Sequence, residues 1–209
     1  MPRTYPVNLL LDGRKCVVVG GGAVAARKAR SLCDAGGRVL VVAPEIDDDL
    51  AAMERDGRLA IERRPFAAAD LAGAFVAVAA TDDPAVNRAA FAAARAAGVL
   101  VNVVDRPEMC DFFVPASIAR GELQIAISTG GTGPGAAKMI RRDLESRLSD
   151  DYAALVEIVA ACRDALFVKF PKNPARRHAA MQRVLALDLL ALIRAGRGAE
   201  ARAEALACI

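Results

Sequence analysis

The chain has 209 residues, with 28 Lys and Arg against 25 Asp and Glu and a formal charge of +3. This length fits one domain with a sizeable core plus an appendage better than two full domains. The small net charge does not indicate a nucleic-acid or membrane partner. A hydrophobic content of 55%, in runs bounded by turn residues, argues against a disordered chain.

The sequence also lacks the usual signs of targeting segments and metal sites. A charged turn at residues 12–15 leaves no apolar core of signal-peptide length before it, and no uncharged stretch reaches transmembrane length. The five cysteines are widely spaced without a CxxC pair, and His178 is the one histidine. We therefore expect a cytoplasmic protein with reduced, mainly buried thiols and no metal site.

The first half of the chain alternates short β-branched runs with Ala-rich stretches, which is the signature of an α/β fold. The expected strands are residues 16–19, 38–42, 59–62, 75–79 and 99–104. The expected helices are residues 24–35, 47–55 and 84–97, with a short turn at 68–71. Because the strands are continuously apolar, they predict a parallel sheet that is covered on both faces.

After Asp105 the pattern changes. Two further strands are expected at residues 111–115 and 123–128, separated by residues 119–122, and a helical pattern runs from residue 136 to the end with a break at residues 171–174. We place domain boundaries near residues 112 and 148. The two late strands have no obvious covering partner, so pairing between subunits of a homodimer is expected to hide their edges.

A G-x-G-x-x-A fingerprint lies directly after the first expected strand. Gly20 permits a tight turn, Gly22 lets the backbone approach a pyrophosphate, and Ala25 allows close packing of the following helix on the strand. The alternative is a tight turn without a ligand. The acid that binds ribose is missing at the end of the second strand, where only Glu45 could serve, so the fingerprint does not decide between NAD and NADP.

The ends of the fourth and fifth expected strands carry further polar residues. Ligands bind outside the carboxyl ends of the strands in such sheets, so Thr81, Asp82 and Asp105 are expected to face the cofactor. Asp105 is then positioned for proton transfer, and partial burial beside a polyanionic substrate would raise its pKa. The alternative for Asp105 is a turn former. Asp82 and Asp83 before Pro84 make a good helix start, and capping is the favoured role of Asp82.

A second glycine-rich loop follows the last expected strand. It contains Ser128, Thr129, Gly130, Gly131 and Thr132. The helix after it carries Lys138, and together these backbone N–H groups, hydroxyls and charges suit a carboxylate or a phosphate. The loop does not have Walker A spacing, and the alternative is a flexible linker.

Several of these segments, in order and at consistent spacing, resemble the precorrin-2 dehydrogenase family. This family also forms the N-terminal part of siroheme synthases and includes bifunctional sirohydrochlorin ferrochelatases. The resemblance spans residues 5 to 150 or so, and the remainder matches only as a loosely patterned helical region. It is carried by residues 19–22, 24–25, 27–29, 80–83, 102–105, 113–116 and 128–132.

The resemblance implies NAD-dependent oxidation of precorrin-2 to sirohydrochlorin for sirohaem or cobalamin, and in some members insertion of Fe2+ in the same cleft. It implies a Rossmann-type NAD-binding domain at residues 1–112, a dimerisation segment at 113–147 and an all-helical C-terminal domain at 148–209. Ala23 and Val24 would lie against the dinucleotide and Pro44 and Glu45 against its adenosine half, and Asp105 would be the essential acid. No room remains for the methyltransferase module of fused enzymes, so methylation is expected elsewhere.

Two other readings stay open beside the dehydrogenase. One is a chelatase in which the dinucleotide is incidental, since the same acid would serve both reactions. The other is a non-catalytic NAD sensor, which would need neither Asp105 nor the second glycine loop.

The basic end of the chain also has two readings. Residues 169–209 hold eight Lys and Arg against three acids. They form either a basic roof over an anionic tetrapyrrole or a solvated helix face, on which His178 would be a surface residue.

Overall fold

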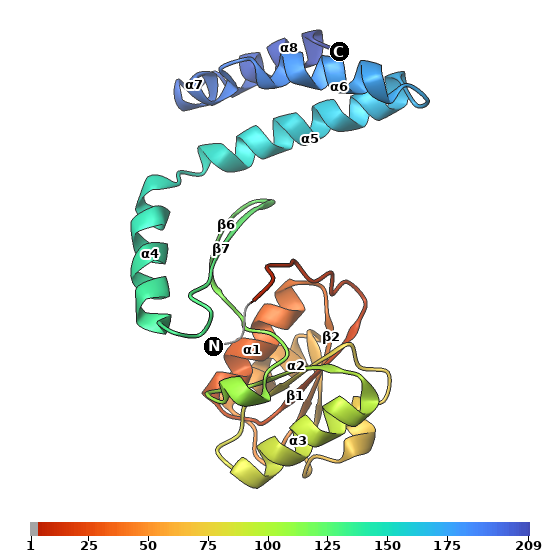
Figure 1. Cartoon of the computed structure of the whole chain (residues 1–209), viewed down its shortest axis with the longest axis vertical. Helices are drawn as coiled ribbons and strands as arrows, with labels where there is room; N and C mark the ends of the chain where they lie inside the picture. Colours follow the sequence, from red (N-terminus) through yellow and green to blue (C-terminus); the bar gives the residue numbers. More distant parts are fainter. Residues whose placement is uncertain (1–3) are drawn as a thin grey trace. The chain divides into compact units, whose positions relative to one another are not determined.

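The computed structural model describes residues 4–209, which divide into two compact units. The first ends at Val114 and the second begins at Pro115. In Figure 1 the first unit runs from red to light green and the second from green to blue. The hairpin and all later helices thus share one unit, and a division of the chain into three domains stays a prediction.

The first unit is built on a five-stranded parallel sheet with the order β3-β2-β1-β4-β5, which is the Rossmann order. Its strands are β1 (Lys15–Val19), β2 (Arg38–Val42), β3 (Leu59–Glu62), β4 (Val76–Ala79) and β5 (Leu100–Val103). The register places Val19 opposite both Val42 and Ala79. The α/β fold and the five expected strands are confirmed, with ends that differ by at most one residue.

Helices cover both faces of this sheet. They are α1 (Ala23–Asp34), α2 (Asp48–Arg55), the short 3-10 helix η1 (Ala68–Leu71) and α3 (Pro84–Ala97). Ala25 of α1 and Leu50 of α2 pack with Val18 on one face. Ala90 of α3 and Leu71 of η1 pack on the other face, where Val17 and Val19 point. Because successive strand residues point to opposite faces, the continuous valines of β1 are buried from both sides.

The first unit ends in a segment that closes the outer edge of β5. The backbone N–H of Asp111 donates to the carbonyl of Val101 at 2.8 Å, and the Asp111 carboxylate accepts the Val101 N–H at 3.1 Å. The same carboxylate pairs with Arg95 at 2.7 Å. A side chain thus replaces part of the strand ladder here, so the expected strand at residues 111–115 is wrong.

The second unit begins with an antiparallel hairpin of β6 (Ala116–Arg120) and β7 (Leu123–Ile127). Arg120 pairs with Leu123, which leaves only Gly121 and Glu122 in the loop. Gly121 has a φ of +54°, and glycine at the first loop position is what a type II′ turn requires. The expected separator at residues 119–122 is therefore too long, because Ala119 and Arg120 continue the strand, whereas the strand expected from residue 123 is confirmed.

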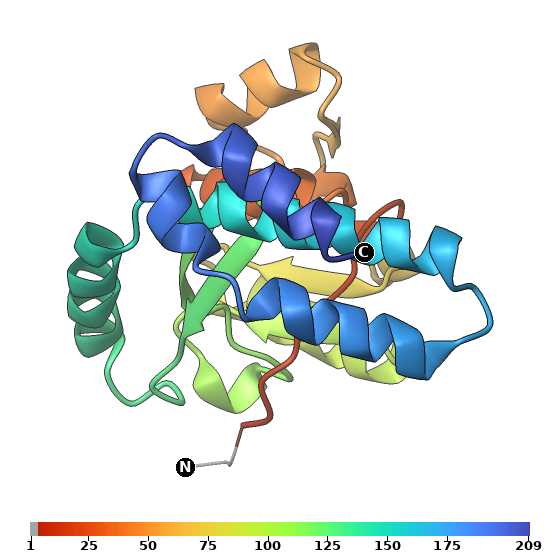
Figure 2. The same ribbon diagram turned by 90° about the horizontal axis from the view of Figure 1, so that it is seen from above.

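Five helices follow the hairpin, in the region where the sequence predicts a helical pattern with one break. They are α4 (Pro134–Arg147), α5 (Asp151–Lys169), α6 (Pro174–Leu185), α7 (Leu189–Arg194) and α8 (Gly198–Ala207). Helix α4 packs against the hairpin, and α5 to α8 lie together around a core that contains the fully buried Cys162 and Val184 (Figure 2). The break at residues 171–174 is confirmed, since Asn173 caps α6 and Pro174 is its first residue.

All five cysteines are free in the described chain. Cys16 and Cys162 are buried and the other three are half-buried. Burial raises the pKa of the Cys16 thiol to about 11. Within residues 4–209, no helix has the length and apolar character needed to cross a membrane.

Two glycines bring the loops at the carboxyl edge of the sheet into backbone contact. Gly20 has a φ of +124°, and a Cβ on it would lie 2.3 Å from the carbonyl oxygen of Ala80. A Cβ on Gly21 would lie 1.8 Å from the carbonyl oxygen of Glu45, and the Gly21 carbonyl accepts the N–H of Asp47 at 2.8 Å. The loops after β1, β2 and β4 therefore pack against one another without room for a methyl group.

We predict that Gly21→Ala destabilises the first unit. The new methyl group must push the Glu45 carbonyl away, which costs about 1–3 kcal/mol of unfolding free energy. Gly22→Ala is the matched control, because its Cβ would meet nothing within 4 Å and its φ of −84° suits alanine. Urea unfolding followed by circular dichroism measures both, and equal stability of the two variants would contradict the close packing at Gly21.

Candidate functional site

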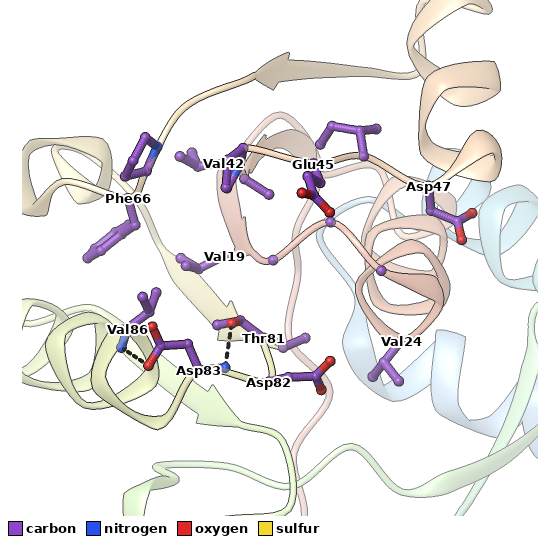
Figure 3. A pocket seen from close by; sticks show the side chains of 18 of the residues that line it. Val19, Val24, Val42, Glu45, Asp47, Phe66, Thr81, Asp82, Asp83 and Val86 are labelled. Atoms are coloured by element: carbon purple, nitrogen blue, oxygen red, sulfur yellow. Dashed lines mark hydrogen bonds between the residues drawn. The ribbon is translucent and has the colours of Figure 1, made fainter.

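A cavity of about 810 Å³ opens at the carboxyl ends of β1, β2 and β4 in the first unit (Figure 3). It is lined by residues 19–24, 42–47, 65–66, 80–83 and Val86. All eight residues expected to bind a cofactor are in this lining: Gly20, Gly22, Ala23, Val24, Pro44, Glu45, Thr81 and Asp82. The structure thus gathers them in one place, while their binding of a dinucleotide stays a prediction.

The glycine loop gives the cavity an open backbone floor. Gly22 is the N-cap of α1, and a Cβ on it would point into open space. It has no side chain to cap the helix, so the first-turn N–H groups of α1 are left for another partner. An uncapped helix N-terminus beside open backbone is suited to a pyrophosphate. Ala25 is fully buried, as its packing role requires. These residues therefore fit a dinucleotide.

The loop between β4 and α3 is held by its own hydrogen bonds. Asp83 caps α3 through the N–H of Ala85 at 2.7 Å, and the Thr81 hydroxyl accepts the Asp83 N–H at 3.0 Å. The amide of Asn87 donates to the Thr81 carbonyl at 2.8 Å. The expectation that Asp82 is the cap is wrong, because Pro84 starts the helix and the residue directly before it reaches the orphan N–H groups.

Four carboxylates lie around the cavity, of which two cap helices and two are exposed. Asp47 and Asp83 are engaged as caps of α2 and α3. Glu45 and Asp82 are exposed and lie on opposite sides of the opening (Figure 3). Among the described residues that line the cavity, none is a lysine or an arginine. The rim therefore favours a ligand with hydroxyl donors there over one with a phosphate at that position.

Asp105 follows β5 at the same edge of the sheet, outside the lining of the cavity. It is exposed rather than partly buried, and it has a φ of +58°. No other non-glycine residue in the described chain has a positive φ. Asp105 therefore lies in a tight turn, and its role as a proton acceptor stays a prediction.

A half-buried cation lies within electrostatic range of this turn. Burial lowers the pKa of Lys28 on α1, and Arg27 lowers it further, whereas the charge of Asp105 acts in the opposite direction. Sequence reasoning did not single out Lys28 as a site residue, because a lysine inside a helical pattern normally lies on the solvated face.

The second glycine-rich loop belongs to the second unit and is internally bonded. The Ser128 hydroxyl accepts the N–H of Gly130 at 3.2 Å, and the Thr129 hydroxyl accepts the N–H of Gly133 at 3.2 Å. The Thr132 hydroxyl donates to the Thr129 carbonyl at 2.6 Å. These bonds organise the loop at the start of α4, on which Lys138 is exposed. Substrate binding by residues 128–132 and Lys138 stays a prediction.

Most of the basic side chains near the end of the chain are bonded within their own unit. Arg177 donates to the carbonyl of Phe170 at 2.6 Å and lies over the ring of Phe167. Arg183 donates to the carbonyl of Cys208 at 2.8 Å, and Lys169 to that of Ile209 at 2.7 Å. These contacts stabilise the helical fold. They favour a structural role for these basic side chains over a basic roof above an anionic ligand. His178 is exposed on α6.

Sequence reasoning missed the far wall of the cavity. Pro65 and Phe66 follow β3 and line the cavity together with Val86 of α3. The signal was available, because a loop after any parallel strand reaches the same edge. Within residues 4–209, no group of three or more His, Cys, Asp or Glu side chains could hold a metal ion.

Comparisons with known proteins agree with this geometry. Residues 7–116 match the family described as putative NAD(P)-binding, and residues 120–147 match the central segment of sirohaem biosynthesis proteins. The siroheme synthase of Methylobacillus flagellatus is 41% identical over 174 residues, which cover 83% of this chain and 37% of the relative. The siroheme synthase of Chromobacterium violaceum is 43% identical over 200 residues, which cover 96% of this chain and 42% of the relative.

The chain thus spans about two fifths of the length of these curated relatives. A solved structure of similar length is that of SirC, a precorrin-2 dehydrogenase, which matches with a TM-score of 0.77 and 29% identity. That match covers 97% of this chain and 98% of SirC. The chain therefore belongs to the putative NAD(P)-binding family that includes siroheme synthases and precorrin-2 dehydrogenases, the family that its sequence motifs resemble.

Proposed function

We propose that this protein is an NAD-dependent dehydrogenase that oxidises precorrin-2 to sirohydrochlorin in sirohaem or cobalamin biosynthesis. The observation that carries the proposal is the cavity at the carboxyl edge of the sheet, with an open glycine loop at the start of α1. The likeness to SirC over nearly the whole of both chains supports the choice of substrate.

The lining of the cavity supports NAD over NADP. Glu45 follows β2 and is exposed at the rim, where a carboxylate can accept hydrogen bonds from ribose hydroxyls. The 2′-phosphate of NADP would meet this carboxylate, with no lysine or arginine among the described lining residues to offset its charge.

The chemistry removes a hydride and a proton from the substrate. When bound, NAD+ supplies the hydride acceptor. The N–H groups at the start of α1 hold the pyrophosphate, and Thr81 and Asp82 lie beside the cavity from the loop after β4. Asp105, at the end of the neighbouring β5, takes the proton on its carboxylate and later releases it to water.

The remaining parts of the proposal extend beyond the first unit. The loop at residues 128–132 and Lys138 bind carboxylates of the tetrapyrrole, and the protein works in the cytoplasm as a homodimer. Insertion of Fe2+ into sirohydrochlorin is a second activity that Asp105 can serve.

Anaerobic incubation with precorrin-2 and NAD+ tests the dehydrogenase, with NADH formation as the measurement. Fe2+ or Co2+ insertion without NAD+ tests the chelatase, and cofactor binding without either reaction would favour a sensor.

The first prediction from this site concerns Gly22. Gly22→Asp places a carboxylate where the pyrophosphate must lie, so it weakens NAD binding by about tenfold or more, which is about 1.4 kcal/mol. Titration calorimetry measures the dissociation constant. Gly22→Ala adds the Cβ without the charge and loses less affinity. Unchanged NAD affinity in a folded Gly22→Asp variant would exclude the pyrophosphate from this loop.

The second prediction concerns Asp105. Asp105→Asn keeps the shape but cannot take the proton, so turnover falls by about 10²–10⁴-fold while NAD still binds. NADH formation from precorrin-2 measures the loss. Glu108→Gln is the control, because it removes an exposed acid from the adjoining 3-10 helix η2 (Pro107–Met109). Near wild-type turnover of Asp105→Asn would mean that this residue only shapes the turn.

The third prediction concerns assembly. The hairpin of β6 and β7 contains two strands only, and each has an outer edge without a strand partner in the described chain. Such edges are commonly covered by pairing with a second chain. Light scattering at micromolar concentration is expected to give the mass of a dimer, and the mass of a single chain would refute the assembly.

A further inference from the structure

The turn that carries Asp105 is an unusual piece of backbone, and its geometry bears on the proposed function. Asp105 adopts the left-handed conformation with a φ of +58°. Aspartate tolerates this conformation better than most residues, but it persists only where neighbouring groups hold it. In the turn itself, the N–H of Arg106 donates to the carbonyl of Val103 at 3.2 Å. The N–H of Val104 also donates to the carbonyl of Ala79 at 2.9 Å, which fixes the start of the turn but does not reach Asp105, whose carboxylate must meet a reacting atom.

The thiol of Cys110 supplies a second constraint from outside the turn. Its sulfur accepts the N–H of Val103 at 3.3 Å, and its S–H faces the carbonyls of Val103 at 3.3 Å and Arg106 at 3.2 Å. Val103 and Arg106 are the residues on either side of the Val104–Asp105 pair. One side chain thus joins the two ends of the turn.

Two neighbours keep Cys110 in this place. The amide of Asn102 is buried and donates both to the Cys110 sulfur at 3.4 Å and to the carbonyl of Phe112 at 2.9 Å. Asp111 is bonded to both backbone groups of Val101. The segment after η2 is therefore fastened along β5 at the cysteine and at the two residues that follow it.

We propose that Cys110 is a positioning residue for Asp105, whose thiol bridges the ends of the turn and orients the carboxylate. The inference rests on the proposed role of Asp105 in the dehydrogenation. Burial raises the pKa of the Cys110 thiol, so the group keeps the proton that it donates. Sulfur also suits the distances, because a hydroxyl oxygen needs shorter contacts of about 2.7–2.8 Å to make the same bonds.

The first test follows the turn without any substrate. Hydrogen exchange of the full-length protein, read by mass spectrometry on peptides that contain residues 103–106, compares wild type with Cys110→Ala. We expect exchange at these amides to accelerate by about tenfold or more, because the turn opens more often without the bridge. Cys33→Ala is the matched control, since Cys33 also donates to a carbonyl, that of Arg58 at 3.3 Å, but far from the turn in the sheet.

The second test follows NADH formation from precorrin-2. Cys110→Ala is expected to lower kcat by about 10- to 100-fold, as for a displaced catalytic group, with KM and the NAD dissociation constant within about twofold of wild type. Cys110→Ser keeps a donor and restores part of kcat. Adding Cys110→Ala to Asp105→Asn is expected to cause no further loss, because a residue that acts through Asp105 has nothing left to position.

The outcomes separate the inference from the proposed function. Unchanged exchange at residues 103–106 in Cys110→Ala overturns the bridge, whatever the activity. Full additivity with Asp105→Asn overturns a role through Asp105. A wild-type protein that forms no NADH from precorrin-2 refutes the proposed function, and the exchange experiment still decides whether Cys110 holds the turn.

Discussion

Backbone-to-backbone packing at Gly20 and Gly21 is the contact on which the rest of the first unit depends. It brings the loop after β1 against the carbonyls of Ala80 and Glu45, so three loops meet at one edge of the sheet. The cavity opens between the loops after β2 and β4, where Gly22 leaves the start of α1 uncovered. A Cβ at either of these two positions would collide with backbone of a neighbouring loop.

The four acids around the cavity differ in role because they lie at different distances from the start of a helix. Asp47 and Asp83 each stand directly before a helix and accept its orphan N–H groups. Glu45 and Asp82 lie one or two residues earlier and remain exposed to the cavity. The distance of an acid from the first helical residue therefore decides whether its carboxylate is engaged in the fold or open to a cofactor.

The outer edge of β5 links the sheet to the proposed chemistry. Asp111 takes the place of a further strand at Val101, and Cys110 and Asn102 continue the same fastening toward the Asp105 turn. The segment that the sequence predicts as a strand at residues 111–115 thus begins with residues that fasten the chain to β5. The alternation of apolar residues cannot reveal this, because the partners are a side-chain carboxylate and a thiol rather than a ladder of backbone groups.

The sequence by itself determined the order of the sheet elements, the fingerprint at Gly20 and Gly22 and the family, because buried strands and phosphate loops impose short local patterns of residue type. Only the tertiary structure decided that Gly20 and Gly21 lie against the carbonyls of Ala80 and Glu45, that Asp111 closes the edge of β5 and that Cys110 lies beside the left-handed Asp105. These features depend on contacts between segments that are separated in the chain. Such contacts form when the sheet brings its loops to a common edge, and no local pattern encodes them.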